Sequence, residues 1–184
     1  DKYYLIPRMK EEGYFDAILE ICHKEGITAI LPLQEDELNL ISENRELFEQ
    51  EGIRTIVSPV ETLQICRDKY CFFEHMTEHG IPVLNSYIDL AEFEKAYEAG
   101  KIGFPVFVKP VQGAGSVGVM KVSCMELLKA LFAYSEEPLL IQEFCNGREF
   151  GIDVYVDLVS GEVVDIFAKE KRSEERRVGK ECTC

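Results

Sequence analysis

The chain has 184 residues, of which 34 are acidic and 20 are basic, so its formal net charge is −14. An acidic surface repels a phosphate backbone, which excludes nucleic-acid binding through a broad basic face. The sequence contains no run of about 18 apolar residues, so it offers no membrane-spanning helix. The hydrophobic fraction of 46% is typical of a chain that forms an apolar core.

Seven cysteines are spread along the chain, and the first five form no CxxC pair and no repeated spacing with histidine. This spacing disfavours a zinc site and a disulfide framework, and it favours reduced thiols. The first residues lack the basic and then apolar pattern of an export signal. We therefore expect a cytoplasmic protein, and the absence of an initiating Met is what we expect of a chain cut from a longer one.

The N-terminal third predicts helices that alternate with short apolar strands. Apolar residues recur at helical spacing over residues 14–25. The apolar run 27–33 predicts a buried strand, residues 36–50 predict a second helix, and residues 53–57 predict another strand. Strand, helix and strand at this pitch favour a parallel βαβ unit. We therefore expect residues 1–66 to form part of a doubly wound, Rossmann-like α/β domain.

The segment that follows predicts a second α/β region. Asp68 and Asp89 each precede a helical pattern and can accept hydrogen bonds from the first turn, so each is expected to cap a helix. The other expected elements are strands at 83–87, 103–110, 118–122, 139–144, 149–158 and 162–169, and a helix at 125–134. The last two strands flank Ser160 and Gly161, which predicts a β-hairpin.

The character of the sequence changes at Arg172. Residues 172–184 are highly charged, show no period and resemble the translation of a sequencing adapter. We therefore expect a non-native tail that takes no part in the fold. A natural basic tail is the alternative.

A glycine-rich loop at residues 113–118, GAGSVG, matches the GxGxxG pattern of dinucleotide-binding folds. Such a site needs a helix directly after the loop, because the helix N-terminus binds the pyrophosphate. Residues 119–122, VMKV, predict a strand instead. The sequence therefore predicts a strand–loop–strand lid whose backbone N–H groups can cover phosphates. The alternatives are a plain hairpin without a ligand and a dinucleotide oxidoreductase.

Charged residues flank this loop on both sides. Lys109 ends the apolar strand that leads into the loop, where an unpaired charge is costly and phosphate is a fitting partner. Further along, an apolar strand runs into a short polar link and then reaches Glu149, whose carboxylate can accept ribose hydroxyls. The alternative is an ordinary strand–turn–strand with surface acids.

Four motifs, in this order, resemble the ATP-grasp superfamily, in the branch of the carbamoyl-phosphate synthase large chain. They are CRDKY at 66–70, GIPV at 80–83, GFPVFVKPVQGAGSVGV at 103–119 and IQEFCNGREFGIDVYVD at 141–157. The resemblance covers roughly residues 1–171. It implies a partial pre-ATP-grasp domain at 1–66 and a partial ATP-grasp domain at 67–171, which comprises the lid subdomain and the first strands of the next.

The resemblance also implies which residues hold ATP. They are, for the phosphates, Lys69, Lys109, Gly113, Ala114, Gly115, Ser116 and Gly118; for the adenine, Gln142, Glu143 and the backbone near Cys145; and for the ribose, Glu149. Glu is common in the family at the position of Gln142. Together these residues would surround one extended nucleotide.

By this resemblance, the intact protein is a ligase that uses ATP and Mg²⁺ to activate a carboxylate or bicarbonate as an acyl phosphate for attack by an amine or ammonia. Such chemistry needs positioning and charge neutralisation, which fits a site made of Lys and Gly. The family's magnesium ligands lie in a later segment, so we assign no metal ligand and expect this chain alone to be inactive. A non-catalytic ATP-binding module is the alternative.

Overall fold

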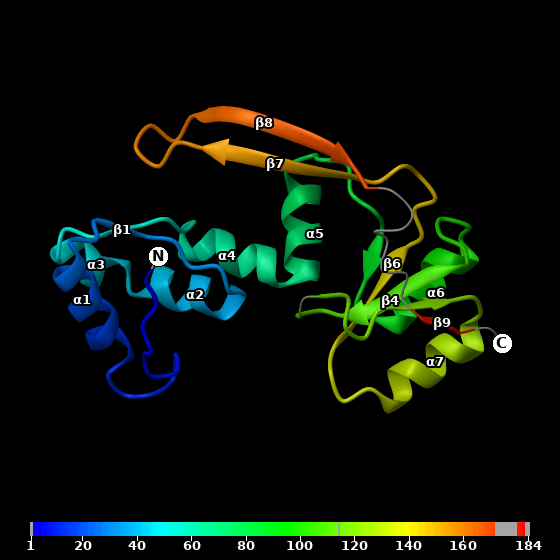
Figure 1. Ribbon diagram of the computed structural model, residues 1–184. Coiled ribbons are helices and arrows are strands. Elements are labelled where there is room, and N and C mark those ends of the chain that lie inside the picture. Colours follow the sequence, from blue (N-terminus) through cyan, green and yellow to red (C-terminus); the bar gives the residue numbers. More distant parts are fainter. Residues whose placement is uncertain (1, 114, 172–179, 183–184) are drawn as a thin grey trace. The chain divides into compact units, whose positions relative to one another are not determined.

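The computed structural model describes residues 2–113, 115–171 and 180–182 (Figure 1). Its contacts divide the chain into two compact units, Asp1–Gln64 and Ile65–Cys184. Of the expected site residues, Ala114 alone lies outside the described part of the chain. Within that part, no helix is both long and apolar enough to cross a bilayer.

The first unit contains the predicted parallel βαβ arrangement, but the buried strand predicted over 27–33 is reduced to Ala29–Ile30, and Leu31 and Leu33 are exposed. Its elements are α1 (Tyr14–Glu25), β1 (Ala29–Ile30), α2 (Glu35–Glu43), α3 (Arg45–Gln50) and β2 (Arg54–Thr55). Strands β1 and β2 pair in parallel, which requires a crossover through the intervening helices. The bounds of α1 agree with the predicted helix because its apolar spacing matches one buried stripe.

The helix predicted over residues 36–50 is interrupted at Asn44, whose side-chain Nδ2 donates to the Leu40 carbonyl at 2.8 Å. The Asn44 backbone N–H donates to the same carbonyl at 3.3 Å, so both donors of Asn44 cap the end of α2 before α3 begins at Arg45. A helix that the sequence did not predict, α4 (Val60–Arg67), follows β2. The core of the unit is formed by Cys22, Ile41, Phe48, Ile53 and Val57.

The second unit contains two sheets. Its helices are α5 (Lys69–Glu78), α6 (Leu90–Glu98) and α7 (Met125–Tyr134). Its strands are β3 (Ser86–Tyr87), β4 (Val106–Pro110), β5 (Met120–Val122), β6 (Leu139–Glu143), β7 (Phe150–Val156), β8 (Val163–Glu170) and β9 (Lys180–Cys182). The larger sheet has the order β3-β6-β4-β5-β9, and β7 and β8 pair only with each other.

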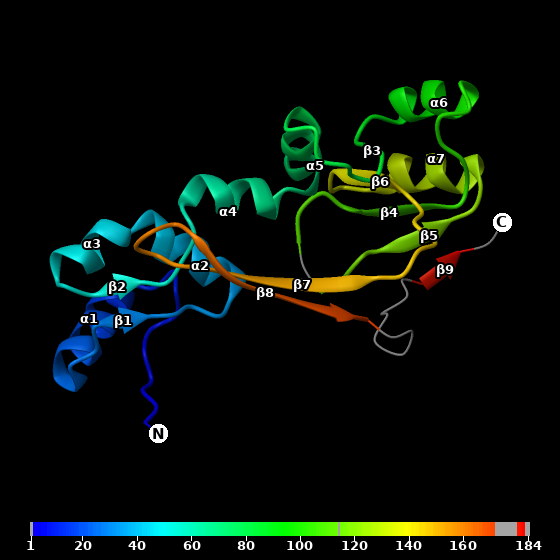
Figure 2. The same cartoon turned by 90° about the horizontal axis from the view of Figure 1, so that it is seen from above.

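Helices α6 and α7 cover one face of the larger sheet (Figure 2). Val106 and Val108 are two residues apart on β4, so their side chains point to the same face. Val122 on β5 is paired with Val106, and Ile141 on β6 is paired with Val108, which places all four in one layer. This layer packs against the two helices and forms the core of the unit.

Both predicted helix caps are present. The Asp68 carboxylate accepts hydrogen bonds from the backbone N–H groups of Tyr70 at 3.0 Å and Cys71 at 2.9 Å. The Asp89 carboxylate accepts one from the N–H of Glu92 at 2.9 Å. These bonds satisfy donors that have no partner within a first turn, and they fix where α5 and α6 begin.

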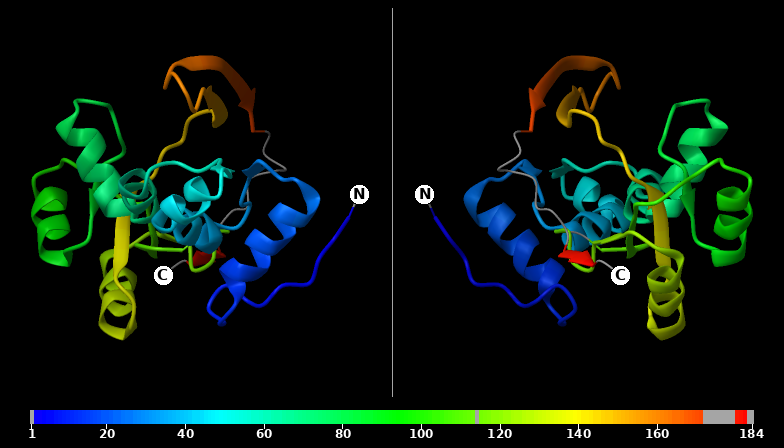
Figure 3. Two further views of the ribbon diagram at one scale, coloured as in Figure 1. Left: turned by 90° about the vertical axis from the view of Figure 1, so that its left-hand side faces the viewer. Right: turned by 90° about the vertical axis from the view of Figure 1, so that its right-hand side faces the viewer.

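Strands β7 and β8 form the antiparallel hairpin that the sequence predicted (Figure 3). Strand β9 differs from expectation, because we expected residues 172–184 to take no part in the fold. Residues 180–182 pair in parallel with β5. An edge strand such as β5 leaves backbone groups open on one side, and a neighbouring segment can pair with them. The non-native origin of residues 172–184 stays a prediction.

Four cysteines, Cys22, Cys66, Cys71 and Cys145, are free thiols, as expected. Cys124 is disulfide-bonded and departs from that expectation.

Candidate functional site

The candidate site lies on the face of the larger sheet opposite α6 and α7. Phe107 and Lys109 alternate with Val106 and Val108 along β4, so they point away from the core layer. Gln142 on β6 and Lys121 on β5 are both paired with Phe107. This open face therefore collects two lysines, an aromatic ring and an amide from three neighbouring strands.

Lys109 is half-buried at the centre of this face. Its ammonium donates a hydrogen bond to the Gln142 Oε1 atom at 2.7 Å. Burial lowers the pKa of Lys109, and the neighbouring ammonium of Lys69 lowers it further. Among the described residues no carboxylate pairs with Lys109, so its charge is held by a neutral amide.

The Gln142 amide is in turn held by Ser86, which is paired with it across β3 and β6. Gln142 Nε2 donates to Ser86 Oγ at 3.1 Å, and Ser86 Oγ donates to the Leu84 carbonyl at 3.0 Å. Ser86 is 3% exposed. A buried hydroxyl with both roles occupied gives the amide one preferred orientation.

Lys69 reaches the same region from the first turn of α5. Its ammonium donates to the carbonyls of Gly113 at 2.8 Å and Val111 at 3.2 Å. Its backbone N–H also donates to the Val111 carbonyl at 3.1 Å. The helix that the Asp68 cap starts is therefore tied to the entrance of the glycine loop, and the two lysines predicted for phosphate lie close enough to affect each other.

The glycine loop joins antiparallel strands β4 and β5, as predicted, so the element that follows it is a strand. Ser116 has φ of 60°, and Gly118 has φ of 72°. A Cβ at Gly118 would lie 3.1 Å from the Pro110 ring. Glycine therefore fits this position for its conformation and for the close crossing of the two strands. This topology excludes the helix-terminated dinucleotide site.

Sequence reasoning missed an aromatic pair on the open face. The rings of Phe107 and Phe144 lie 5.4 Å apart, and the Lys121 ammonium lies 5.0 Å from the Phe144 ring centroid. Flat aromatic surfaces of this kind can stack a nucleobase. The signal was available in the sequence, because Phe107 stands two residues before Lys109 and strand alternation puts both on one face.

Glu143 follows Gln142 directly on β6. Neighbouring residues on a strand point to opposite faces, so the two side chains point apart, and the expected contact of each with the adenine stays a prediction. The Glu143 carboxylate accepts from Asn85 Nδ2 at 2.8 Å and from the Asn85 N–H at 3.3 Å. Its side chain therefore braces the segment before β3. Cys145, two residues after Glu143, is exposed.

Glu149 lies just before β7. Its carboxylate accepts from the Lys171 ammonium at 2.7 Å, and its carbonyl accepts from the Lys171 N–H at 2.8 Å. Its predicted convergence with Lys109 on one nucleotide stays a prediction. In the part of the chain that the structure describes, no group of three or more His, Cys, Asp or Glu residues could hold a metal ion.

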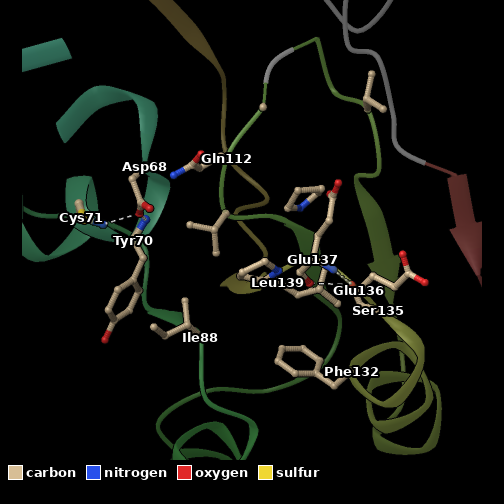
Figure 4. A pocket seen from close by; sticks show the side chains of 15 residues that line it. Asp68, Tyr70, Cys71, Ile88, Gln112, Phe132, Ser135, Glu136, Glu137 and Leu139 are labelled. Atoms are coloured by element: carbon tan, nitrogen blue, oxygen red, sulfur yellow. Dashed lines mark hydrogen bonds between the residues drawn. The ribbon is translucent and has the colours of Figure 1, made fainter. Parts of the chain in front are cut away.

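A cavity of about 1080 Å³ opens beside the loop entrance (Figure 4). It is lined from the start of α5 by Asp68 and Tyr70 and from the turn before β6 by Glu136 and Glu137. Gln112 and Gly113 of the loop also line it. The cavity therefore adjoins the backbone that Lys69 holds, without including Lys109 or Gln142.

Family models match both units. Residues 1–56 match the PylC-like N-terminal domain, and residues 76–173, more than half of the chain, match the D-Ala–D-Ala ligase C-terminus. The D-alanine–D-alanine ligase of Corynebacterium aurimucosum is 30% identical over 140 residues, which are 72% of this chain and 38% of that protein. The arginine-specific carbamoyl phosphate synthase large chain of Bacillus subtilis is 28% identical over 115 residues, which are 61% of this chain and 11% of that protein.

Solved structures show the same fold. The N5-carboxyaminoimidazole ribonucleotide synthetase of Thermus thermophilus matches with a TM-score of 0.63 at 21% identity, over 90% of this chain and 42% of that one. The L-amino acid ligase of Bacillus licheniformis matches with a TM-score of 0.59 at 22% identity, over 91% of this chain and 39% of that one. The chain thus spans less than half the length of these relatives. With its paired lysines, glycine hairpin and matching family model, the chain belongs to the D-Ala–D-Ala ligase C-terminal family of the ATP-grasp superfamily.

Proposed function

We propose that the chain forms the nucleotide-holding part of an ATP-dependent carboxylate–amine, or carbamoyl phosphate-forming, ligase. The observation that carries this proposal is the convergence of Lys69 and Lys109 at the entrance of the glycine hairpin. The Lys109 ammonium is half-buried beside a second ammonium, which is costly, and a polyphosphate is a partner that relieves this cost. Backbone N–H groups of the loop add donors for the same oxygens.

The remaining residues of the site are proposed to position the rest of the nucleotide. The pair of Phe107 and Phe144 offers an apolar surface to the base. The resemblance of the motif around Glu149 supports a contact between its carboxylate and the ribose hydroxyls. In that arrangement Lys109 and Glu149 lie at opposite ends of one extended ligand, with Lys69 on the phosphate side.

The proposed reaction has two steps for amide formation. An oxygen of the carboxylate or bicarbonate attacks the terminal phosphorus, the bond to the β-phosphate oxygen breaks, and ADP leaves. The nitrogen of an amine or ammonia then attacks the acyl carbon, inorganic phosphate leaves, and the nitrogen loses a proton. Formation of carbamoyl phosphate needs a third step, in which an oxygen of the carbamate attacks the terminal phosphorus of a second ATP and a second ADP leaves. The lysines assist the first step because they neutralise charge on the transferred group.

Magnesium accompanies ATP in this proposal, as the resemblance implies. The described residues do not supply a metal cluster, so no ligand is assigned to them and no step is routed through the metal. The proposal also includes a cytoplasmic location, which the four free thiols favour and the disulfide at Cys124 does not.

Nucleotide titration of the 184-residue chain tests the proposal. We expect Lys109→Ala to weaken ATP binding at least roughly ten-fold, because it removes a partly buried charge from the phosphate path. In a full-length version it should also abolish turnover, whereas Glu149→Ala should mainly weaken binding, since ribose contacts act alike in ground and transition states.

The matched control is Lys101→Ala, which removes an exposed ammonium after α6 and should leave ATP affinity unchanged. Calorimetry with ATP and with adenosine separates phosphate contacts from base contacts. Equal ATP affinity in the Lys109→Ala variant and the unaltered chain would show that the site assignment is wrong.

A further inference from the structure

The cavity beside the loop entrance differs in charge from the lysine-bearing face of the larger sheet (Figure 4). Among the described residues that line it, three are acidic, Asp68, Glu136 and Glu137, and none is Lys, Arg or His. Lys69 contacts the loop backbone nearby but does not line the cavity. The cavity therefore disfavours a phosphate and favours a ligand with positive charge.

Most of the remaining lining is apolar. Phe132 of α7 and Leu139 of β6 are half-buried and pack against the core of the second unit, so they form a packed wall. Tyr70 lines the cavity from α5, and Ile88 lines it from the segment after β3. The volume of about 1080 Å³ is enough for a small organic molecule. The cavity can thus take the apolar body of a ligand as well as a charged group.

The two glutamates stand on a turn whose backbone is held in place. Ser135 Oγ donates to the Glu137 carbonyl at 2.7 Å and accepts from the Glu137 N–H at 3.2 Å. The Pro138 carbonyl accepts from the Val111 N–H at 3.0 Å, which ties the turn to the end of β4. Within the described part of the chain, neither the Glu136 nor the Glu137 carboxylate has a hydrogen bond or an ion pair, so both are open to a ligand.

These acidic side chains do not form a metal centre. Among the described residues, no group of three or more His, Cys, Asp or Glu could hold a metal ion. The Asp68 carboxylate already accepts from the N–H groups of Tyr70 and Cys71. An ammonium group is less demanding in geometry, since one or two carboxylates suffice and an aromatic ring can contact it as well. An organic ammonium therefore fits the cavity better than a metal ion.

We propose that the cavity is a second ligand site, which binds a primary ammonium compound with an apolar body. The ammonium lies beside Glu136 and Glu137, and the body lies against Phe132 and Leu139. The inference goes beyond the proposed function and does not depend on ATP binding. Because Lys109 is not part of the cavity, this ligand is distinct from the amine that attacks the acyl phosphate.

Titration of the whole 184-residue chain with 2-phenylethylamine, followed by the chemical shifts of backbone amides, tests the inference. 2-Phenylethanol has nearly the same shape without the charge, and 3-phenylpropanoate carries a negative charge. The amine should bind about five-fold more tightly than the alcohol, which is the contribution of one or two exposed ion pairs, and the carboxylate should bind more weakly than both. The amides of lining residues such as Ile88 and Leu139 should shift, and ATP should not displace the amine.

A double variant, Glu136→Gln with Glu137→Gln, removes both carboxylates at exposed positions. It should lower the affinity for the amine about five-fold and leave the affinity for the alcohol unchanged. The matched control is Glu98→Gln with Glu162→Gln, which changes the net charge equally at exposed positions outside the cavity and should change neither affinity.

Three results would overturn the inference. Equal affinity for the amine and the alcohol, or equal losses from the two double variants, would show that the carboxylates of the cavity do not select the ligand. Amide shifts confined to residues outside the lining would show that the cavity is not the site. Displacement by ATP would place the amine in the nucleotide site. If the chain binds the amine as expected but does not bind ATP, the proposed function fails and this inference stands.

Discussion

The larger sheet and the β7–β8 hairpin of the second unit have strands of similar composition, yet only the sheet has a covered face. Ile141 on β6 is 0% exposed under α6 and α7, whereas Ile166 on β8 is 62% exposed. Both strands were predicted from runs rich in apolar residues. The comparison shows that such a run predicts a strand, while burial depends on what packs against it.

Substitution of one isoleucine in each region should give the largest difference. Ile141→Ala leaves a cavity between sheet and helices and should lower the free energy of unfolding by about 3 kcal/mol. Ile166→Ala removes an exposed side chain and should change it by less than about 0.5 kcal/mol. Urea denaturation followed by circular dichroism measures both. A large loss from Ile166→Ala would show that the hairpin face is covered in solution.

The capped start of α5 supports the sheet region and should give an intermediate effect. Asp68→Ala removes the acceptor for Tyr70 and Cys71 and should cost about 1 kcal/mol. Hydrogen exchange should locate the loss in α5 and the loop entrance and leave the hairpin amides unchanged. Faster exchange in β7 and β8 would show that the two regions unfold together.

The pH dependence of this cap follows from its charge. Burial raises the pKa of Asp68, but the N–H groups of Cys71 and Tyr70 and the Gln112 side chain lower it by more, so the net shift is downward. The cap's charged stabilisation is therefore present above the unfolded pKa of about 3.9 and is lost as pH falls through the lower folded value. Asp68→Asn keeps an acceptor and should remove that pH dependence.

An exposed ion pair at the base of the hairpin should give the smallest effect. Arg148 donates from Nε and Nη2 to the two carboxylate oxygens of Glu170 at 2.8 and 3.1 Å, and its guanidinium also lies over the Phe150 ring. Because the pair is solvent-exposed, Arg148→Ala should cost only about 0.5 kcal/mol. The loss of unfolding free energy should be smaller in 1 M salt. A loss that salt does not alter would show that it comes from the contact with the Phe150 ring.

Local signals predicted much of the fold. The bounds of α1 and α7, the caps at Asp68 and Asp89, and the strand–loop–strand hairpin all follow from spacing or from a nearby side chain. The break at Asn44 and the short α4 were missed; at Asn44 the side chain bonds to the Leu40 carbonyl, a local contact that apolar spacing does not reveal.

The candidate site was predicted less completely, because its contacts cross strands. Lys69 and Lys109 were identified from their places beside the glycine loop. The roles of Ser86 and Asn85 could not be, since they depend on the register of β3 against β6, more than fifty residues later in the sequence. Phe107 could have been identified from alternation alone, and so could the opposite directions of the Gln142 and Glu143 side chains.

The pairing of β4 with its two neighbouring strands ends at different residues. Its pairing with β5 stops at Val108, whereas its pairing with β6 continues through Lys109 to Pro110. Lys109, which carries the half-buried ammonium, is thus held by β6, on the side away from β5. Insertions or replacements in the glycine loop can therefore change which ligand the loop contacts without shifting Lys109. The fold thus allows ligand specificity to change in the loop while the Lys109 ammonium keeps its position.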